Sequence, residues 1–288
     1  MLIFVIINPV SGDKNKNGVT NFLRQLDQQD FSLTFYYTTG KNDSKEIQKC
    51  IDDNDFDRVL VVGGDGTIRM VAEILLNANI SLGIIPMGSA NGLAKDLDIP
   101  EDWKKAVKIA LSDKIETIDT IRINDEHLCL HLADFGLNAR LVKGYQLNDR
   151  RGMFGYGLEL LKTLSLSEST FEGKLTLNEE DVLLKAEMVV IANSRMYGTG
   201  AVINPNGKLN DGLFEVCIVR NASMKLLLEM LLDPEKLFSM DLVKIYHTKQ
   251  VTLNLNENQP FQVDGEYLGD LDHLTAKIIA SSLRVLVP

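Results

Sequence analysis

The segment Val59–Thr67 restricts the fold of this 288-residue chain more than any other part of the sequence. The four apolar residues at its start, Val59–Val62, are typical of a strand that is covered on both faces of a sheet. They run directly into Gly63-Gly64-Asp65-Gly66-Thr67, after which apolar residues recur at the spacing of one helical face. A strand, a glycine-rich turn and a helix in direct succession predict one βα unit of a parallel sheet.

The rest of residues 1–118 repeats this alternation of strands and helices. Apolar runs predict further strands at Leu2–Ile7, Phe31–Tyr37 and Leu82–Ile85. Helical spacing of apolar residues predicts helices over Val19–Leu26, Ser44–Ile51, Ile68–Leu75 and Trp103–Ala110, the last of which is opened by Pro100-Glu101-Asp102. Repeated βα units predict an N-terminal α/β domain with a doubly wound parallel sheet.

The pattern changes after Ile115, where short apolar segments alternate with turn residues. We expect strands at Glu116–Ile123, His127–Asp134, Ala186–Asn193, Leu213–Val219, Val251–Leu255 and Phe261–Asp264. Hairpin turns are expected at Asn124-Asp125, Asn210-Asp211-Gly212 and Asp264-Gly265. The sequence therefore predicts an α/β domain over residues 1–118 and a mostly antiparallel β domain over residues 119–280, with residues 281–288 as a segment that could return to the first domain.

Composition excludes several classes of protein. The net charge of −10 argues against nucleic acid as the main partner, because binding to a phosphate backbone needs a basic face. The three cysteines are widely spaced and form no CxxC pattern, so we expect no disulfide framework or zinc site and place the chain in the reducing cytoplasm. The apolar N-terminus runs straight into Asn8-Pro9, which indicates a first strand and not a signal peptide.

The turn Gly63-Gly64-Asp65-Gly66-Thr67 has the chemistry of a phosphate site. Its glycines let the backbone turn sharply close to a ligand, and the free amides at the start of the following helix favour phosphate. Asp65 would repel phosphate, so we expect it to hold a magnesium ion, a water or a substrate hydroxyl. A glycine-rich βα turn with a capping Asp is the alternative, and neither GxxxxGK[ST] nor GxGxxG occurs in the chain.

Two further polar, glycine-containing loops follow predicted strands. Asn8-Pro9-Val10-Ser11-Gly12 follows the first strand, and Pro86–Gly92 follows the fourth. Ligands of an open parallel sheet bind outside the carboxyl ends of its strands, so we expect these loops and Gly63–Thr67 to converge on one site. Either loop alone could be an ordinary turn.

These residues carry a family resemblance. NPVSG, GGDGT and PMGSANGLA, in this order, resemble the diacylglycerol kinase catalytic family, which includes bacterial lipid kinases and sphingosine and ceramide kinases. The resemblance continues through Asn193, Tyr197–Gly200, Asn210–Leu213 and Asp264–Glu266, so it covers nearly the whole chain. It implies a phosphofructokinase-like α/β domain for the nucleotide and a β-sandwich domain for the lipid, with the active site in the cleft between them.

The resemblance also implies roles for individual residues. Glu266 matches the catalytic base, with Asp264 beside it, Asp65 at the phosphates, and Asp119 as a carboxylate that helps to position the catalytic magnesium. ATP contacts are implied from Asn8, Pro9, Val10, Ser11, Gly12, Thr38, Gly63, Gly64, Asp65, Gly66, Thr67, Ile68, Arg69, Gly88, Ser89 and Asn91.

A structural magnesium site is implied in the second domain. Its ligands would be the Asp211 side chain and backbone carbonyls near Lys208 and Leu213, a set of oxygen atoms that suits this hard cation. The alternative for the same residues is a plain Asn-Asp-Gly hairpin turn. One position departs from the family pattern, because Gly92 stands where bacterial diacylglycerol kinases usually carry Asp, and this leaves the identity of the lipid open.

Two segments are candidates for contact with a membrane. The first is basic and aromatic and comprises Arg140, Lys143, Arg150, Arg151, Met153, Phe154 and Tyr156. The second is the leucine-rich stretch Met224–Phe238, which is predicted to be a helix. A solvated charged loop and a buried core helix are the respective alternatives.

We therefore expect an ATP- and Mg²⁺-dependent lipid kinase that phosphorylates a hydroxyl of diacylglycerol or a related lipid in phospholipid metabolism. A NAD kinase is the first alternative, because that family shares the GGDG loop. A nucleotide-binding regulator without catalysis is the second. The expected partners are ATP and a membrane lipid, with peripheral association at the membrane and no nucleic acid. The oligomeric state stays open, with a homodimer as one alternative.

Overall fold

The computed structural model describes residues 1–12, 16–26, 31–147, 170–196, 202–220 and 243–288. The chain divides into two compact units, one formed by residues 1–118 with 281–288 and the other by residues 119–280. The first boundary falls within β5 (Ile115–Ile123) and the second within β14 (Glu266–Leu286).

The first unit is built on a parallel sheet with the strand order β2-β1-β3-β4. Its strands are β1 (Leu2–Ile7), β2 (Ser32–Tyr37), β3 (Arg58–Gly63) and β4 (Ser81–Pro86). The end of β14 lies beside β4, where Val285 pairs in parallel with Leu82. Every residue of β3 and β4 is buried, which explains their nearly continuous apolar sequences.

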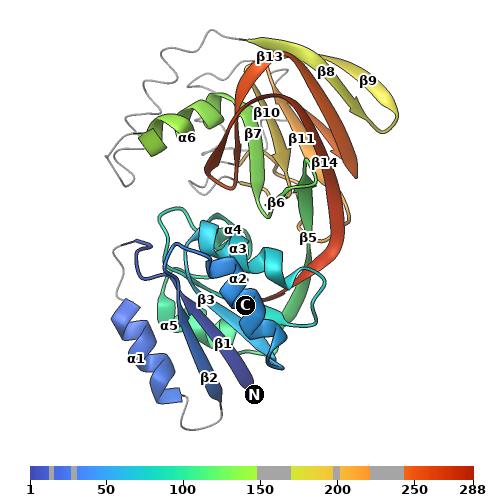
Figure 1. Ribbon diagram of the computed structural model, residues 1–288. Coiled ribbons are helices and arrows are strands. Elements are labelled where there is room, and N and C mark those ends of the chain that lie inside the picture. The colour runs from blue at the N-terminus through green and yellow to red at the C-terminus, as the bar shows by residue number, and fades with distance from the viewer. Residues whose placement is uncertain (13–15, 27–30, 148–169, 197–201, 221–242) are drawn as a thin grey trace. The chain divides into compact units, whose positions relative to one another are not determined.

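Helices cover both faces of this parallel sheet (Figure 1). They are α1 (Lys16–Leu26), α2 (Asp43–Asp52), α3 (Asp65–Leu75), α4 (Gly92–Asp96) and α5 (Trp103–Ala110). α1 and α5 share one face, where Phe22 meets Trp103 edge to face at 5.7 Å between ring centroids. Asp102 caps α5, because its side chain accepts hydrogen bonds from the backbone amides of Lys104 and Lys105, as expected for a helix start at this position.

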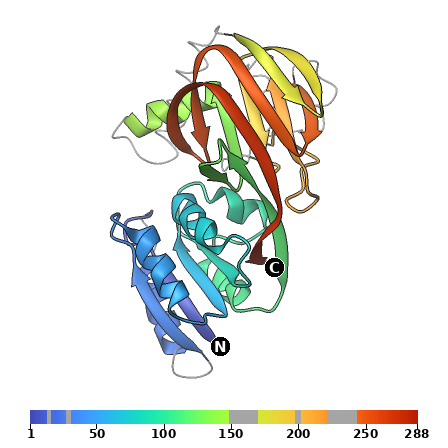
Figure 2. The ribbon, with the colours of Figure 1, turned by 45° about the vertical axis from the view of Figure 1, so that its right-hand side comes forward.

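The second unit is mostly antiparallel, with the strand order β12-β11-β10-β7-β13-β14. Its other strands form two attachments: β8 pairs with β13 and β9, and β6 pairs with β5. The yellow β8–β9 hairpin lies beside the orange β13 in Figure 2. The elements are β6 (His127–Cys129), β7 (Leu132–Gly136), α6 (Leu137–Leu147), β8 (Phe171–Leu177), β9 (Glu180–Ala186), β10 (Met188–Ala192), β11 (Phe214–Val219), β12 (Val243–Thr248) and β13 (Gln250–Val263).

Two apolar clusters lie on opposite faces of the strands at the centre of this unit. Along β10, Val189 and Ile191 point into the larger cluster, whereas Met188, Val190 and Ala192 point into the smaller one. β10 is therefore buried on both faces, which is why five successive apolar residues form it.

The predicted fold class, an α/β domain followed by a mostly antiparallel β domain, is confirmed. Some details differ. The strands expected separately at Val251–Leu255 and Phe261–Asp264 are one strand, β13, with a register shift between Asn254 and Gln259. The prediction of a hairpin turn at Asn210-Asp211-Gly212 is wrong, because the described residues before it, 203–209, form no strand. The turns at Asn124-Asp125 and Asp264-Gly265 do connect paired strands.

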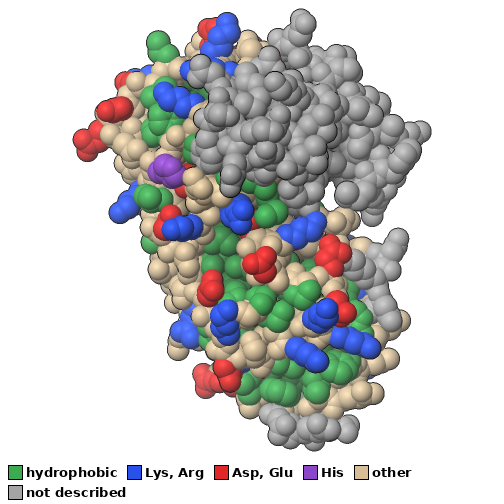
Figure 3. Space-filling model, turned by 180° about the vertical axis from the view of Figure 1, so that it is seen from behind, with side chains coloured by type: hydrophobic (Ala, Val, Ile, Leu, Met, Phe, Trp, Pro, Cys, Tyr) green, Lys and Arg blue, Asp and Glu red, His purple; other side chains and the backbone are tan. Residues whose placement is uncertain are grey.

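Several predicted features lie outside the described residues. These are the helix at Met224–Phe238, the motif residues Tyr197–Gly200, and the part of the basic segment from Arg150 to Tyr156. Among the residues that are described, no helix is both long and apolar enough to cross a bilayer. On the face drawn in Figure 3, Lys and Arg side chains alternate with Asp and Glu, so the described surface there has no single sign of charge.

Candidate functional site

The loops after β1 and β3 meet at the carboxyl end of the parallel sheet. The Asn8 side chain donates a hydrogen bond from Nδ2 to the Thr67 hydroxyl at 2.9 Å, and the Asn8 backbone amide donates to the Val62 carbonyl at 3.0 Å. The Asn8 carbonyl oxygen accepts from the Ser11 hydroxyl at 3.2 Å, and Asn8 Oδ1 accepts from the Val10 amide at 3.0 Å. Asn8 thus shapes its own loop and ties it to the first turn of α3.

The loop after β4 packs against both of these loops, backbone to backbone. The Met87 amide donates to the Gly63 carbonyl at 2.7 Å. Gly12, at φ +58°, lies so close to the Met87 carbonyl that an added Cβ would come within 2.4 Å of its oxygen. A Cβ on Gly64 would lie 2.9 Å from the Gly88 Cα. Glycine at these positions lets the three loops converge within the first unit.

Asn91 holds the third loop in shape. Its side chain is fully buried; Oδ1 accepts from the Gly88 amide at 2.8 Å, and Nδ2 donates to the Gly88 carbonyl at 3.0 Å. The residue adopts a left-handed φ of 53°, which Asn tolerates better than most residues. Ser89 is exposed at the tip of this loop. Asn91 is therefore a framework residue of the loop, and Ser89 is the residue that the loop presents.

The N-terminus of α3 is suited to an anion. Gly64 occupies the N-cap, so no capping side chain covers the first amides of the helix. Gly66 is exposed in the first turn, and no atom lies within 4 Å of the place where its Cβ would be. Asp65 is partly exposed at the first helical position, and Arg69 lies one turn further along. The helix dipole and the absence of a capping side chain here favour phosphate.

Thr38 lies at the end of β2, where its amide donates to the Ile7 carbonyl at 2.9 Å. The loop that follows is organised by Asp43, whose carboxylate accepts from the Thr39 and Gly40 amides at 2.8 and 2.7 Å and from the Tyr36 hydroxyl at 2.8 Å. Burial alone would raise the pKa of Asp43, but these hydrogen bonds together hold it below its ordinary value. Burial and the hydrogen bond to this carboxylate raise the pKa of Tyr36 to about 12.

The residues from Asp264 to Glu266 lie in the second unit, at the turn between β13 and β14. Asp264 and Gly265 have left-handed φ angles of 49° and 84°, and Val263 pairs with Glu266 across the turn. The Asp264 carboxylate accepts three successive backbone amides, those of Leu130, His131 and Leu132, at 2.9, 3.0 and 3.2 Å. Asp264 therefore anchors the turn, and Glu266 is exposed directly after it.

The loop that contains Asp211 wraps around Asp119. The buried Asp119 carboxylate accepts from the Gly212 amide at 2.6 Å, and its own amide donates to the Leu209 carbonyl at 2.6 Å. Asp211 is exposed, and Oδ1 of its side chain accepts from the Leu213 amide at 3.1 Å. In the described part of the chain no group of three or more His, Cys, Asp or Glu gathers as a metal site.

The donor set at Asp211 nevertheless fits a hard cation, since the loop offers one carboxylate and several carbonyl oxygens. The glycine-lined loops and open helix N-terminus of the first unit likewise fit a nucleotide phosphate.

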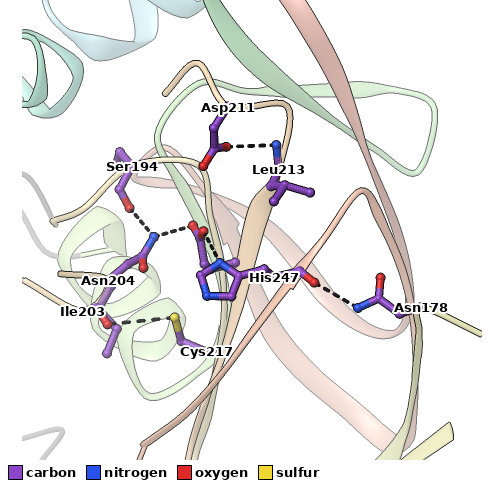
Figure 4. A network of polar contacts seen from close by, with 9 residues as sticks. Asn178, Ser194, Ile203, Asn204, Asp211, Leu213, Cys217 and His247 are labelled. Atoms are coloured by element: carbon purple, nitrogen blue, oxygen red, sulfur yellow. Dashed lines mark hydrogen bonds and ion pairs between the residues drawn. The ribbon is translucent and has the colours of Figure 1, made fainter. Parts of the chain in front are cut away.

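A buried polar network lies beside the Asp211 loop, and sequence reasoning missed it (Figure 4). Glu215 is 2% exposed; it accepts from Asn204 Nδ2 at 2.5 Å and pairs with His247 Nδ1 at 2.8 Å. Asn204 also reaches the Ser194 carbonyl at 3.4 Å, and the Ser194 hydroxyl pairs with His131 Nδ1 at 2.7 Å. Burial raises the pKa of Glu215, and the hydrogen bonds from His247 and Asn204 oppose that rise. The available signal was a Glu inside the apolar strand Phe214–Val219.

The described cations of the predicted membrane segment have partners within the second unit. Arg140 donates to the Gln259 side chain at 3.0 Å. Lys143 pairs with Asp270 at 3.1 Å and lies 4.9 Å from the centre of the Tyr267 ring. The hydrogen bonds with Tyr267 and Asp270 raise the pKa of Lys143. These two residues therefore fasten α6 to the β13–β14 hairpin.

An α/β unit with three glycine-containing loops at one sheet edge, followed in sequence by an antiparallel β unit, defines the class of protein. The model of the diacylglycerol kinase catalytic domain matches residues 2–123, and that of the YegS C-terminal NAD kinase beta sandwich-like domain matches residues 134–287. The chain therefore belongs to the family of diacylglycerol kinases and YegS-like lipid kinases, and it is a kinase.

Individual relatives agree along most of the chain. It is 28% identical over 278 residues to a diacylglycerol kinase of Bacillus subtilis (strain 168), and the matched region covers 93% of this chain and 90% of that protein. It is 26% identical over 219 residues to a protein of Chromohalobacter salexigens named "Probable lipid kinase YegS-like", with 73% and 69% covered. A crystal structure of a diacylglycerol kinase from Bacillus anthracis str. Sterne has the same fold, with a TM-score of 0.79, 21% identity, and 99% and 96% of the two chains covered.

Proposed function

We propose that this chain is an ATP- and Mg²⁺-dependent lipid kinase that transfers the γ-phosphoryl group to a hydroxyl of diacylglycerol or a closely related lipid. The main support is the convergence of three loops on the uncapped N-terminus of α3, which offers amides and open space to a chain of phosphates. Residues 1–118 with 281–288 would bind the nucleotide, and residues 119–280 would bind the lipid.

Within the first unit, each loop has a distinct part in nucleotide binding. Residues 8–12 and 63–69 would contact the phosphates through backbone amides. Space for the phosphates is open at Gly66, where an added Cβ would meet no atom within 4 Å. Thr38 directly follows β2, and Ser89 lies in the loop after β4. These strands flank β1 and β3, so both residues would extend the binding surface along the sheet edge. Asp65, at the first position of α3, would hold Mg²⁺, which offsets phosphate charge when it is bound.

In the second unit, Glu266 would act as the general base. An alcohol has a high pKa, so a carboxylate must accept its proton as the new oxygen–phosphorus bond forms. Glu266 is exposed and follows a turn whose Asp264 is held by three amides, so its backbone position is well fixed. Asp119 would help to position the catalytic Mg²⁺. The loop 208–213, which bonds to the Asp119 carboxylate, would hold a second Mg²⁺, with Asp211 and the carbonyls of Lys208 and Leu213 as ligands.

Peripheral contact with a membrane follows from the proposed substrate, because diacylglycerol stays in the bilayer. A cytoplasmic protein would then dock on the inner leaflet. NAD phosphorylation is the second candidate, since the description of the matching C-terminal domain names an NAD kinase beta sandwich.

The test is an ATP-consumption screen with diacylglycerol, sphingoid bases and phosphatidylglycerol in mixed micelles, and with NAD in solution. We expect phosphate transfer to one lipid class. Transfer to NAD and to no lipid would contradict the proposal, and binding of ATP without any turnover would favour a regulator.

The variant Glu266→Gln tests the base. It should lower kcat by about 10²-fold or more, the usual contribution of general base catalysis, without changing the affinity for ATP. Asp272→Asn is the matched control, because Asp272 is another exposed carboxylate on β14. Equal activity in the two variants would remove Glu266 from the reaction.

A further inference from the structure

Asp134 is a fully buried carboxylate in the middle of β7, a strand in which all five residues are buried. It pairs with Val190 of β10 on one side and with Gln262 of β13 on the other. An apolar side chain would suit this position, because burying a polar group is unfavourable unless hydrogen bonds replace its water. Neither Asp134 nor Gln262 has a role in the function proposed above.

The hydrogen bonds of Asp134 lead toward the turn that precedes Glu266. Its Oδ2 accepts from Asn138 Nδ2 at 2.7 Å and from Gln262 Nε2. The other end of the same amide, Gln262 Oε1, accepts from the backbone amide of Gly265 at 2.7 Å. Gln262 thus connects a buried carboxylate to the residue next to Glu266.

The direction of the Gln262 amide depends on Asp134. A carboxylate oxygen accepts hydrogen bonds, so it attracts the NH₂ end of the amide and turns the carbonyl end toward Gly265. With the amide reversed, its NH₂ group would face the Gly265 N–H, donor against donor. Asp134 therefore selects the one amide orientation that can hold the turn.

The turn is then fixed at both of its residues. Asp264 is held through its side chain by the amides of residues 130–132, and Gly265 is held through its backbone by Gln262. Both turn residues have left-handed backbone conformations, which are less favourable for Asp264 than for Gly265. The hydrogen bonds therefore oppose relaxation of the turn. The Cα position of Glu266 follows directly from the conformation of these two residues.

We propose that Asp134 and Gln262 are positioning residues for Glu266, and that their hydrogen bonds fix the turn from which this carboxylate projects. The proposal rests on the function assigned above to Glu266. Neither residue would touch the substrate, so their contribution would be seen in turnover and not in the affinity for ATP.

The decisive variant is the double substitution Asp134→Leu with Gln262→Leu. It replaces the buried polar pair by an apolar pair, a change that is often neutral or stabilising for a protein. We expect a thermal unfolding midpoint close to that of the wild type. We also expect kcat to fall by about 10- to 100-fold, as for other small displacements of a catalytic group, with the KM for ATP unchanged. A folded double variant with wild-type kcat would overturn the proposal.

Two single substitutions separate positioning from packing. Asp134→Asn keeps an oxygen that accepts from both amides, so it should retain most of the wild-type kcat; a loss as large as that of the double variant would count against the acceptor role. Phe135→Leu is the packing control on the same strand, since Phe135 packs on Phe261 within the larger apolar cluster. It should lower the unfolding midpoint and leave kcat of the folded protein intact. A matching fall in kcat would mean that any disturbance of β7 has the same effect.

Hydrogen exchange of the Gly265 amide provides a readout that does not depend on the reaction. In the double variant this amide should exchange at least about fivefold faster than in the wild type, the effect of losing one hydrogen bond. Unchanged exchange would refute the positioning of the turn. If the wild type phosphorylates no lipid, the function proposed for Glu266 fails, and the exchange rate alone then decides whether Asp134 and Gln262 hold this turn.

Discussion

The side-chain amide of Asn8 donates a hydrogen bond of 2.9 Å to the hydroxyl of Thr67, across 59 positions of sequence. This contact joins the loop after β1 to the first turn of α3. Both loops are proposed to bind phosphate, so their spacing should determine how well they do so together.

The substitution Thr67→Val tests this contact, because it removes the hydroxyl and nearly conserves volume. We expect the KM for ATP to rise about 3- to 10-fold, equivalent to a single hydrogen bond of about 1 kcal/mol. Thr20→Val is the matched control: Thr20 is also buried, and its hydroxyl donates to the Lys16 carbonyl within α1. An equal change of KM in both variants would show that the hydrogen bond between the two loops does not contribute to ATP binding.

The glycines of the three loops should separate into two kinds. Gly88→Ala would place a Cβ 2.6 Å from the Gly64 Cα, so it should lower the free energy of unfolding by about 1–3 kcal/mol, as overpacking does. Gly66→Ala meets no atom within 4 Å and lies in a helix, so it should be neutral or stabilising. It should still lower the affinity for ATP, because the phosphates are proposed to occupy that space. Denaturant unfolding and ATP titration measure the two effects, and a Gly66→Ala protein with normal ATP affinity would place the phosphates elsewhere.

Asp43 should make the first unit sensitive to acid. Its pKa is lower in the folded than in the unfolded state, so its stabilising effect is present above about pH 4 and is lost as pH falls through the folded pKa. Asp43→Asn sets an NH₂ group against the Gly40 amide and should cost about 1–3 kcal/mol at neutral pH. The difference in the free energy of unfolding between this variant and the wild type should shrink in acid. Asp52→Asn, an exposed carboxylate on the same helix, should change stability little at any pH.

Glu215 should give the opposite dependence on pH. Burial raises its pKa above the unfolded value, so the folded state binds the proton more tightly. The free energy of unfolding therefore falls as pH rises from the unfolded-state pKa to the folded-state pKa. Glu215→Gln removes the titration and keeps the side-chain shape. We expect the variant to gain stability relative to wild type as pH rises above the ordinary pKa of a glutamate. A relative loss over that range of pH would show that the pairing with His247 outweighs the burial of the carboxylate.

The fold of the first unit could be predicted because each of its strand–helix units carries its own local pattern. The meeting of Asn8, Thr67 and Gly88 followed from topology, since parallel strands end at the same edge of a sheet. The start of α5 after Pro100-Glu101-Asp102 was also predicted, because the residues that open the helix are adjacent to it in sequence.

Contacts between distant single residues left no such pattern. Asp134 and Gln262 are 128 positions apart, and a lone Asp in an apolar strand does not reveal its partner. Lys143 was assigned to a basic segment because Asp270, which neutralises it, lies 127 residues later. The strand β14 was missed because it mixes charged residues, Gly269 and apolar residues without regular alternation over its 21 residues.

The assignment of residues 281–288 to the first unit has a consequence for the order of folding on the ribosome. Leu283, Val285 and Leu286 are buried there, and Val285 pairs with β4. These residues emerge only after all of residues 119–280 have been synthesised. Until then β4 has an unpaired edge, which is open to pairing with other nascent chains. The first unit to be translated is therefore the last to be completed, and we expect fragments that end at residue 118 to aggregate.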